Sequence, residues 1–272
     1  MLLKVDHVTR YRYDRPVRAV VQSHRLTPSV HDGQKVLDWA VTVTEGVPGG
    51  VFRDGAGDAV QGWTVLGPLS QIDVTVSGTV ETFDLSGILK GHRETAAPEC
   101  YLRPTGPTRA DKGLAELALT VAGADALSTA HGLAAAVTQA IAYRPGVTTA
   151  ATTAAEALAL GEGVCQDHAH ALIALARHRG IAARYVSGYL YSDGDGVAGD
   201  AAHAWAEIHV AGIGWIGFDP ANECCPDDRY IRLGSGLDAQ DAALIRGIAR
   251  GAGVESMDVS VQVRAMQTQS QQ

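Results

Sequence analysis

Cysteine is scarce in this sequence. The 272 residues include only four cysteines, and no two of them are spaced as C-x-x-C; they are Cys100, Cys165, Cys224 and Cys225. Structural zinc sites and disulfide frameworks both need several cysteines at short, regular spacings. The sequence therefore predicts neither, and such sparse cysteine is typical of a reducing compartment.

Long apolar runs and basic patches are absent as well. No stretch of about 18 apolar residues occurs, so no membrane-spanning helix is predicted. The first residues, M-L-L-K-V-D-H, reach charge at once, which argues against a signal peptide. With a formal net charge of −8, the chain offers no basic surface for nucleic acid or for an anionic membrane. We therefore expect a cytoplasmic protein that binds neither.

The residues that are present suit a folded protein with two parts. Hydrophobic residues make up 46% of the chain, and the length is sufficient to bury a core. Residues 1–84 alternate apolar and polar positions, as in V-D-H-V-T-R-Y and I-D-V-T-V-S-G, with turns such as P-G-G between such runs. This period of two predicts antiparallel strands, and their number predicts a small N-terminal β-sandwich.

The composition changes after the predicted sandwich. Residues 85–110 contain glycine and several prolines and are predicted to form a linker. Alanine-rich segments then predict helices, and A-R-Y-V-S-G-Y-L, A-H-A-W-A-E-I-H-V and G-W-I-G-F-D predict strands. The fold class is therefore α+β, with a second domain over residues 111–266 whose alternating M-D-V-S-V-Q-V joins a sheet. Residues 267–272 are predicted to be a polar tail.

Cys165 lies in G-E-G-V-C-Q-D-H-A-H, at the start of a predicted helix. Ala169, Leu172 and Ile173 follow at positions +4, +7 and +8, so they form one apolar stripe with Cys165. The N-terminus of a helix carries partial positive charge and free N–H groups, which favour a thiolate and can stabilise an oxyanion. The pattern is thus compatible with a nucleophile, and equally with a buried structural cysteine.

A nucleophilic thiol also needs a base and a group that orients the base. The strand A-H-A-W-A-E-I-H-V places His203 and Trp205 on one face. Antiparallel pairing with W-I-G-F-D-P brings Asp219 within a few positions of His203, and an odd loop or a bulge puts both on that face. A cysteine at a helix tip with histidine and aspartate on adjacent strands is a Cys-His-Asp arrangement.

Four motifs occur along the chain in a characteristic order: G-V-C-Q-D-H-A-H, A-R-Y-V-S-G-Y-L, A-H-A-W-A-E-I and W-I-G-F-D-P-A-N. Together they resemble the core of the bacterial transglutaminase-like family, which belongs to the papain-like cysteine enzymes. Residues 1–84 resemble the β-domain that precedes this core in one bacterial branch, notably at H-V-T-R-Y-R-Y-D-R-P-V and H-R-L-T-P. The resemblance implies helices packed on an antiparallel sheet, with Cys165 as nucleophile, His203 as general base and acid, and Asp219 as the orienting residue.

The triad implies acyl transfer at an amide bond through a thioester, with a peptide or amide as substrate and no cofactor. If water accepts the acyl group, the enzyme is a cysteine peptidase or amidase, and this is our expectation. If an amine accepts it, the enzyme is a transglutaminase. Which acceptor reacts depends on how well the site excludes water. A non-enzymatic transglutaminase-like scaffold that binds partners is the alternative of another class.

Four residues are further candidates for the surroundings of the triad. Asp167 is expected to accept hydrogen bonds at the helix start, and Gln166 lies beside it on another face. His168, at position +3, is expected to stay near the Cys165 face and to contact the pocket. Trp205 is expected either to line an acyl pocket or only to pack. No metal is expected, because no histidine and cysteine spacing here matches a standard zinc site.

Two segments lack a clear assignment. The loop S-D-G-D-G-V-A-G-D, residues 192–200, lacks the spaced carboxylates of an EF-hand. Because it leads directly to His203, it is a candidate for an active-site lid. The adjacent Cys224 and Cys225 depart from the family pattern, and we expect them to be incidental.

Overall fold

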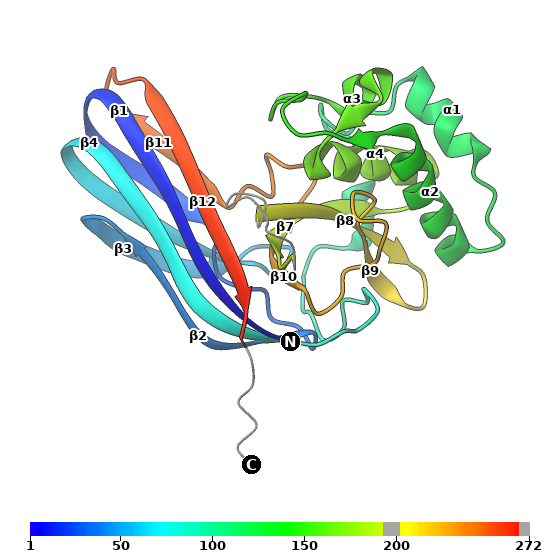
Figure 1. The fold of residues 1–272 in the computed structure, drawn as a ribbon, viewed down its shortest axis with the longest axis horizontal. Helices are drawn as coiled ribbons and strands as arrows, with labels where there is room; N and C mark the ends of the chain where they lie inside the picture. The colour runs from blue at the N-terminus through cyan, green and yellow to red at the C-terminus, as the bar shows by residue number, and fades with distance from the viewer. Residues whose placement is uncertain (193–201, 267–272) are drawn as a thin grey trace, which may run out of the picture.

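The computed structural model describes residues 1–192 and 202–266. Figure 1 shows long strands on the left, with the helices and shorter strands on the right. The predicted lid at 192–200 lies, except for its first residue, outside the described residues, as does the predicted tail at 267–272. The α+β class is confirmed, with antiparallel sheets in both parts of the molecule.

The long strands form one continuous antiparallel sheet of six. Its centre is the antiparallel pair of β1 (Leu2–His24) and β4 (Ala59–Thr82). The register of this pairing shifts between Arg12 and Val17 of β1. Tyr11 and Val20, from either side of this shift, lie in the same buried cluster, so the two halves of the sheet share a core. The predicted sandwich is thus built from one sheet, because β1 and β4 run through both halves. The other strands are β2 (Gln34–Val43) and β3 (Gly46–Arg53), paired with β4, and β11 (Ile245–Arg250) and β12 (Glu255–Ala265), paired with β1.

The C-terminal strands correct the predicted domain limits. The sequence assigns residues 111–266 to the second domain, whereas β11 and β12 pair with β1 in the N-terminal sheet. The physical reason is the free edge of β1, whose backbone N–H and C=O groups need partners on the side away from β4. Alternation in the sequence predicts a strand but does not identify its partner.

The second part packs four helices on a smaller antiparallel sheet with the strand order β10-β7-β8-β9. Helix α4 is central to it, because every residue from Asp167 to Arg177 is buried. Ala204, Ala206 and Ile208 of β8 lie in the same buried cluster as α4, as the predicted strand alternation requires. The elements are α1 (Lys112–Thr120), α2 (Ala126–Ala140), α3 (Ala154–Leu160), α4 (Cys165–His178), β7 (Ala183–Leu190), β8 (Ala202–Val210), β9 (Gly214–Phe218) and β10 (Tyr230–Gly236), with the short parallel pair β5 (Ala142–Tyr143) and β6 (Glu162–Gly163) and a 3-10 helix η1 (Pro98–Leu102).

The segment predicted as a linker, residues 85–110, is packed against the smaller sheet. The Leu89 N–H donates to the Trp215 carbonyl at 2.9 Å, and Ile88 forms a bridge with Ile216 of β9. Farther along the same segment, Glu94 accepts a hydrogen bond from the Trp215 indole at 2.5 Å. The Thr95 N–H donates to the Gly55 carbonyl of the N-terminal part at 3.0 Å, so residues 85–110 contact both parts of the molecule.

A buried cluster of charges reinforces this junction. Glu207 on β8 accepts from Arg184 Nε at 2.6 Å and from Arg232 Nε at 2.9 Å. Arg232 also donates to Asp58, at 2.6 Å, and Arg184 donates to Glu94. Asp58 lies in the connection between β3 and β4 of the long-stranded sheet, whereas both arginines belong to the smaller sheet. The cluster therefore joins the two parts.

Candidate active site

The start of α4 is fixed by a carboxylate. Asp167 Oδ2 accepts from the Val164 N–H at 2.8 Å and from Thr148 Oγ1 at 2.7 Å. Asp167 is buried, and its position in the first helical turn also suits the positive end of the helix dipole. Asp167 therefore takes the place the sequence predicts, and it sets the direction in which the chain enters Cys165.

Gly163 packs directly against the Asp167 side chain. A Cβ built at Gly163 would lie 2.7 Å from the Asp167 Cβ and 2.8 Å from its Oδ2, closer than side chains can approach. The position thus requires glycine for space, since its backbone conformation is otherwise ordinary.

We expect Gly163→Ala to lower the melting temperature by roughly 2–12 °C, because overpacking of this kind costs about 1–3 kcal/mol. Thermal unfolding followed by circular dichroism measures the change. Gly106→Ala is the matched control, because a Cβ at Gly106 would meet nothing within 4 Å. Equal losses in the two variants would contradict the role assigned to Gly163.

The structure brings the three predicted triad residues together. His203 Nε2 lies 2.6 Å from Asp219 Oδ2, and the Cys165 thiol is near enough to the same imidazole to raise its pKa. Strands β8 and β9 pair without a register shift, and a three-residue turn, 211–213, connects them. Of the two devices that the sequence leaves open, the odd loop is therefore the one that places Asp219 on the face of His203.

The electrostatics favour an ion pair in the triad. Burial lowers the pKa of His203, but the hydrogen bonds and negative charges of Asp219 and Cys165 outweigh it and raise this pKa to about 10. Burial raises the pKa of Asp219, yet its hydrogen bonds and the charge of His203 hold this pKa below the ordinary value. At neutral pH, the imidazole is therefore protonated and the carboxylate is ionised.

Two further side chains contact Asp219, and neither is among the residues predicted for the site. Asn222 Nδ2 donates to Asp219 Oδ2 at 2.7 Å, and Tyr230 Oη donates to the same oxygen at 2.8 Å. Asn222 ends the motif W-I-G-F-D-P-A-N, so a signal for it exists in the sequence. Tyr230 has no such signal, because it lies on β10, outside every motif.

The cysteine pair is divided between two surroundings. Cys224 Sγ lies 3.3 Å from Tyr230 Oη, whereas Cys225 packs against the buried cluster around α4. All four cysteines are free. The expectation that the pair is incidental stays a prediction, and Cys224 contacts Tyr230, which in turn contacts Asp219.

His168 and Gln166 face away from the reacting groups. His168 is buried, and its ring nitrogens lie 2.9 Å from the carbonyls of Val164 and Ile141. Because both nitrogens are engaged, the ring joins the start of α4 to the end of α2, and the predicted contact with the pocket does not follow. Gln166 Nε2 donates to the Ala150 carbonyl at 3.4 Å, so it holds the loop before α3.

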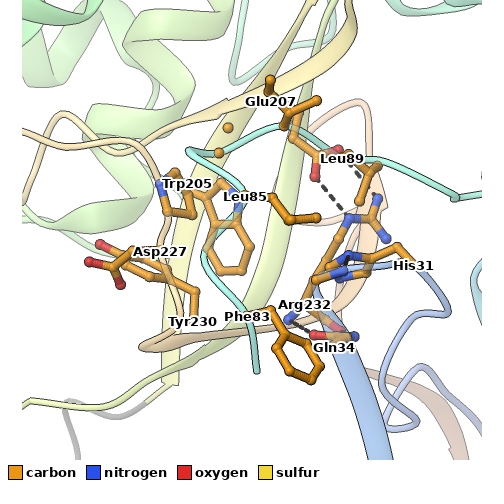
Figure 2. A pocket seen from close by; sticks show the side chains of 15 residues that line it. His31, Gln34, Phe83, Leu85, Leu89, Trp205, Glu207, Asp227, Tyr230 and Arg232 are labelled. Atoms are coloured by element: carbon orange, nitrogen blue, oxygen red, sulfur yellow. Dashed lines mark hydrogen bonds and ion pairs between the residues drawn. The ribbon is translucent and has the colours of Figure 1, made fainter. Parts of the chain in front are cut away.

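Trp205 packs against His203. Its ring stacks on His203, with centroids 6.4 Å apart, and meets the Tyr230 ring edge to face at 5.5 Å. Figure 2 shows Trp205 and Tyr230 on one wall of a pocket that also carries Phe83 and Leu85. With a volume of about 50 Å³, this pocket has room for a few waters. Trp205 therefore packs against His203 and Tyr230 and also lines this small pocket.

A second, larger pocket is lined in part by Asp219. Its volume is about 350 Å³, and α2 and the segment after β9 form its walls. Asp219, Glu223 and Cys224 line it, together with Thr138 of α2. A group of substrate size therefore has space directly beside the triad carboxylate.

Two features are absent from the described part of the chain, residues 1–192 and 202–266. No group of three or more histidine, cysteine, aspartate or glutamate side chains is placed to hold a metal ion there. Within the same residues, no helix is long and apolar enough to cross a bilayer.

Comparison with known proteins identifies the family and the fold of this chain. Residues 116–220 match the model of the transglutaminase-like superfamily, and residues 3–81 match that of the bacterial transglutaminase-like N-terminal region. An uncharacterized protein of Mycobacterium leprae is 30% identical, over 96% of this chain and 98% of its own. Another, of Mycobacterium bovis, is 31% identical over 96% and 91%. A crystal structure described as a putative cysteine protease from Cytophaga hutchinsonii superposes with a TM-score of 0.77 at 23% identity, covering 100% of this chain and 92% of that one.

Proposed function

The chain belongs to the transglutaminase-like superfamily, with the N-terminal region of its bacterial members, and we propose that it hydrolyses amide bonds through a thioester on Cys165. The observation that carries the proposal is the buried pair of His203 and Asp219, whose side chains lie 2.6 Å apart, with the Cys165 thiol close enough to raise the pKa of His203. A binding scaffold has no use for a buried carboxylate and imidazole arranged next to a thiol, so the scaffold alternative lacks comparable support.

In this mechanism, His203 Nε2 is held by Asp219, which leaves Nδ1 as the nitrogen that faces the thiol. The proton of Cys165 rests on the imidazole, and the thiolate sulfur attacks the carbonyl carbon of the amide. The carbon–nitrogen bond then breaks as the imidazolium gives its proton to the leaving amine. The acyl group remains on sulfur as a thioester, and the imidazole is ready to act as a base.

The first turn of α4 supplies the oxyanion site. The first N–H groups of a helix have no partner within the helix, and Cys165 is the first residue of α4. The Cys165 N–H is therefore placed to donate to the carbonyl oxygen as that oxygen gains negative charge. The helix dipole acts in the same direction, because its positive end faces the developing charge.

Water is the acceptor that this proposal favours. Cys165 is partly exposed, so solvent reaches the thioester, and neutral His203 can take a proton from a water molecule that attacks it. One observation favours an amine acceptor instead. Glu223 lines the larger pocket beside Asp219, and a carboxylate there would attract a cationic amine.

The test measures the rate at which iodoacetamide alkylates Cys165 between pH 6 and pH 9, by intact-mass spectrometry. In the wild type, we expect a fast and nearly constant rate, because the ion pair persists over this range. In His203→Ala, the rate should rise about tenfold per pH unit toward pH 8.5, as for an ordinary thiol. Cys165→Ala identifies the labelled site. A wild-type profile that coincides with that of His203→Ala would reject the proposal.

The acceptor is identified separately, with a library of blocked peptides incubated with and without methylamine. Free acid products in both samples would support hydrolysis, and N-methylamide products in the second would show amine transfer. Cys165→Ala should give neither product, which serves as the control for contaminating peptidases.

A further inference from the structure

Three side chains donate hydrogen bonds to a single oxygen of Asp219. His203 Nε2 lies 2.6 Å from Asp219 Oδ2, Asn222 Nδ2 lies 2.7 Å from it, and Tyr230 Oη lies 2.8 Å from it. The other oxygen, Oδ1, accepts from the backbone N–H groups of Ala221 and Asn222 at 3.1 and 3.4 Å. The carboxylate is thus held at both oxygens, and only one of its five donors belongs to the triad.

The Tyr230 hydroxyl is a permanent donor in this arrangement. Burial, followed by the charge of Asp219, raises the pKa of Tyr230 far above its ordinary value, so the hydroxyl keeps its proton. Because that single proton is directed at Asp219, the Cys224 thiol must donate to Tyr230 Oη rather than accept from it. A directed chain therefore runs from Cys224 through Tyr230 to Asp219.

Tyr230 also contacts His203, the histidine that is hydrogen bonded to Asp219. Its ring meets His203 edge to face with centroids 5.9 Å apart, and it meets Trp205 at 5.5 Å. In Figure 2, the Tyr230 and Trp205 rings lie next to each other below the strand that carries Glu207. One residue of β10 therefore bounds the imidazole by its ring and fixes the carboxylate by its hydroxyl.

We propose that Tyr230 and Asn222 are positioning residues that keep Asp219 ionised and turned toward His203. Asp219 is 1% exposed, and a carboxylate so removed from water stays charged only when hydrogen bonds replace its hydration. The backbone N–H groups of Ala221 and Asn222 supply such bonds to Oδ1, and His203 supplies one to Oδ2. The two additional donors complete this solvation and leave the carboxylate no freedom to rotate. This inference rests on the proposed function, because it concerns how the same triad is kept ready.

The experiment uses the pH profile of Cys165 alkylation by iodoacetamide, extended down to pH 4. In Tyr230→Phe, we expect the pH at which reactivity falls off on the acid side to rise by roughly one unit, since Asp219 loses one side-chain donor and protonates more easily. Asn222→Ala should move the profile in the same direction. Because Asn222 is exposed, this second variant tests the proposal even if Tyr230→Phe folds poorly.

Tyr189→Phe is the matched control. Like Tyr230, Tyr189 is buried, and its hydroxyl has a side-chain partner, His7, at 2.7 Å. Tyr189 lies in a different buried cluster from Tyr230, so Tyr189→Phe removes a buried hydroxyl without touching Asp219. An acid-side shift in Tyr230→Phe and Asn222→Ala, but not in Tyr189→Phe, would support the proposal. Wild-type profiles in Tyr230→Phe and Asn222→Ala, or an equal shift in Tyr189→Phe, would overturn it.

The wild-type profile separates this outcome from failure of the proposed function. If wild-type Cys165 behaves as an ordinary thiol, the triad itself is not active, and both proposals fall. If the wild type is reactive at low pH and the two variants match it, the proposed function stands and the assignment of Tyr230 and Asn222 is wrong.

Discussion

Replacement of Glu207 by alanine is expected to lower the free energy of unfolding by about 3–5 kcal/mol, because it leaves two buried guanidinium groups without their shared partner. Burial opposes ionisation of Glu207, yet Arg232 and Arg184 lower its pKa to about 2, so the carboxylate is charged at neutral pH. For a chain of this length, the corresponding loss in melting temperature is about 6–20 °C. Urea and thermal unfolding at pH 7 measure both quantities.

An exposed ion pair serves as the control for Glu207. Lys112 and Glu116 lie one helical turn apart, with side chains 89% and 66% exposed, so Glu116→Ala should cost less than about 0.5 kcal/mol. A second variant, Glu207→Gln, keeps the shape and removes the charge, and it should be nearly as destabilising as Glu207→Ala. If Glu207→Gln were as stable as the wild type, the buried charges would not be what joins the two parts of the molecule.

The stability that His203 contributes is expected to vanish in alkaline solution. Its pKa is about 10 in the folded protein, against an ordinary value of 6.5, so the folded state binds the proton more tightly than the unfolded state does. This contribution is therefore fully present below pH 6.5 and is lost as the pH rises through 10. Between pH 6 and pH 9, the difference in unfolding free energy between wild type and His203→Gln should shrink by about 3 kcal/mol.

Comparison of the two proteins at each pH cancels the titration of all groups that they share. Urea unfolding at pH 6, 7, 8 and 9 gives the difference directly. Asp219→Asn should show the same flattened dependence as His203→Gln, because the bond to Asp219 is the largest contribution that raises the histidine pKa. A difference that stays constant from pH 6 to pH 9 would mean that His203 is not protonated in the folded state at neutral pH.

The triad could be predicted because each member lies in a segment with a strong local pattern. The apolar stripe after Cys165 fixes a helix start, and the alternation around His203 fixes a strand face. Asp219 then follows from the short connection between two adjacent strands, but the sequence leaves open whether an odd loop or a bulge puts it on the face of His203, and the structure has the odd loop. Local periodicity and short loops carry this information without reference to the rest of the chain.

Contacts between residues that lie far apart in the sequence could not be predicted in this way. Tyr230 and Arg232 reach Asp219 and Glu207 from β10, and Asp58 reaches Arg232 from a position 174 residues away. No periodic pattern marks such contacts, because they depend on how the strands are ordered in space. The same reason explains why the strand character of β12 is legible in the sequence whereas its pairing with β1 is not.

The position of β1 between β4 and β12 has a consequence for biosynthesis. Residues 3–13 leave the ribosome long before their partners, residues 255–265. Until those partners are made, this edge of the sheet stays open, and its unpaired N–H and C=O groups can pair with another nascent chain. A chain that stops before residue 245 keeps both halves of that edge exposed and should depend on chaperones or aggregate.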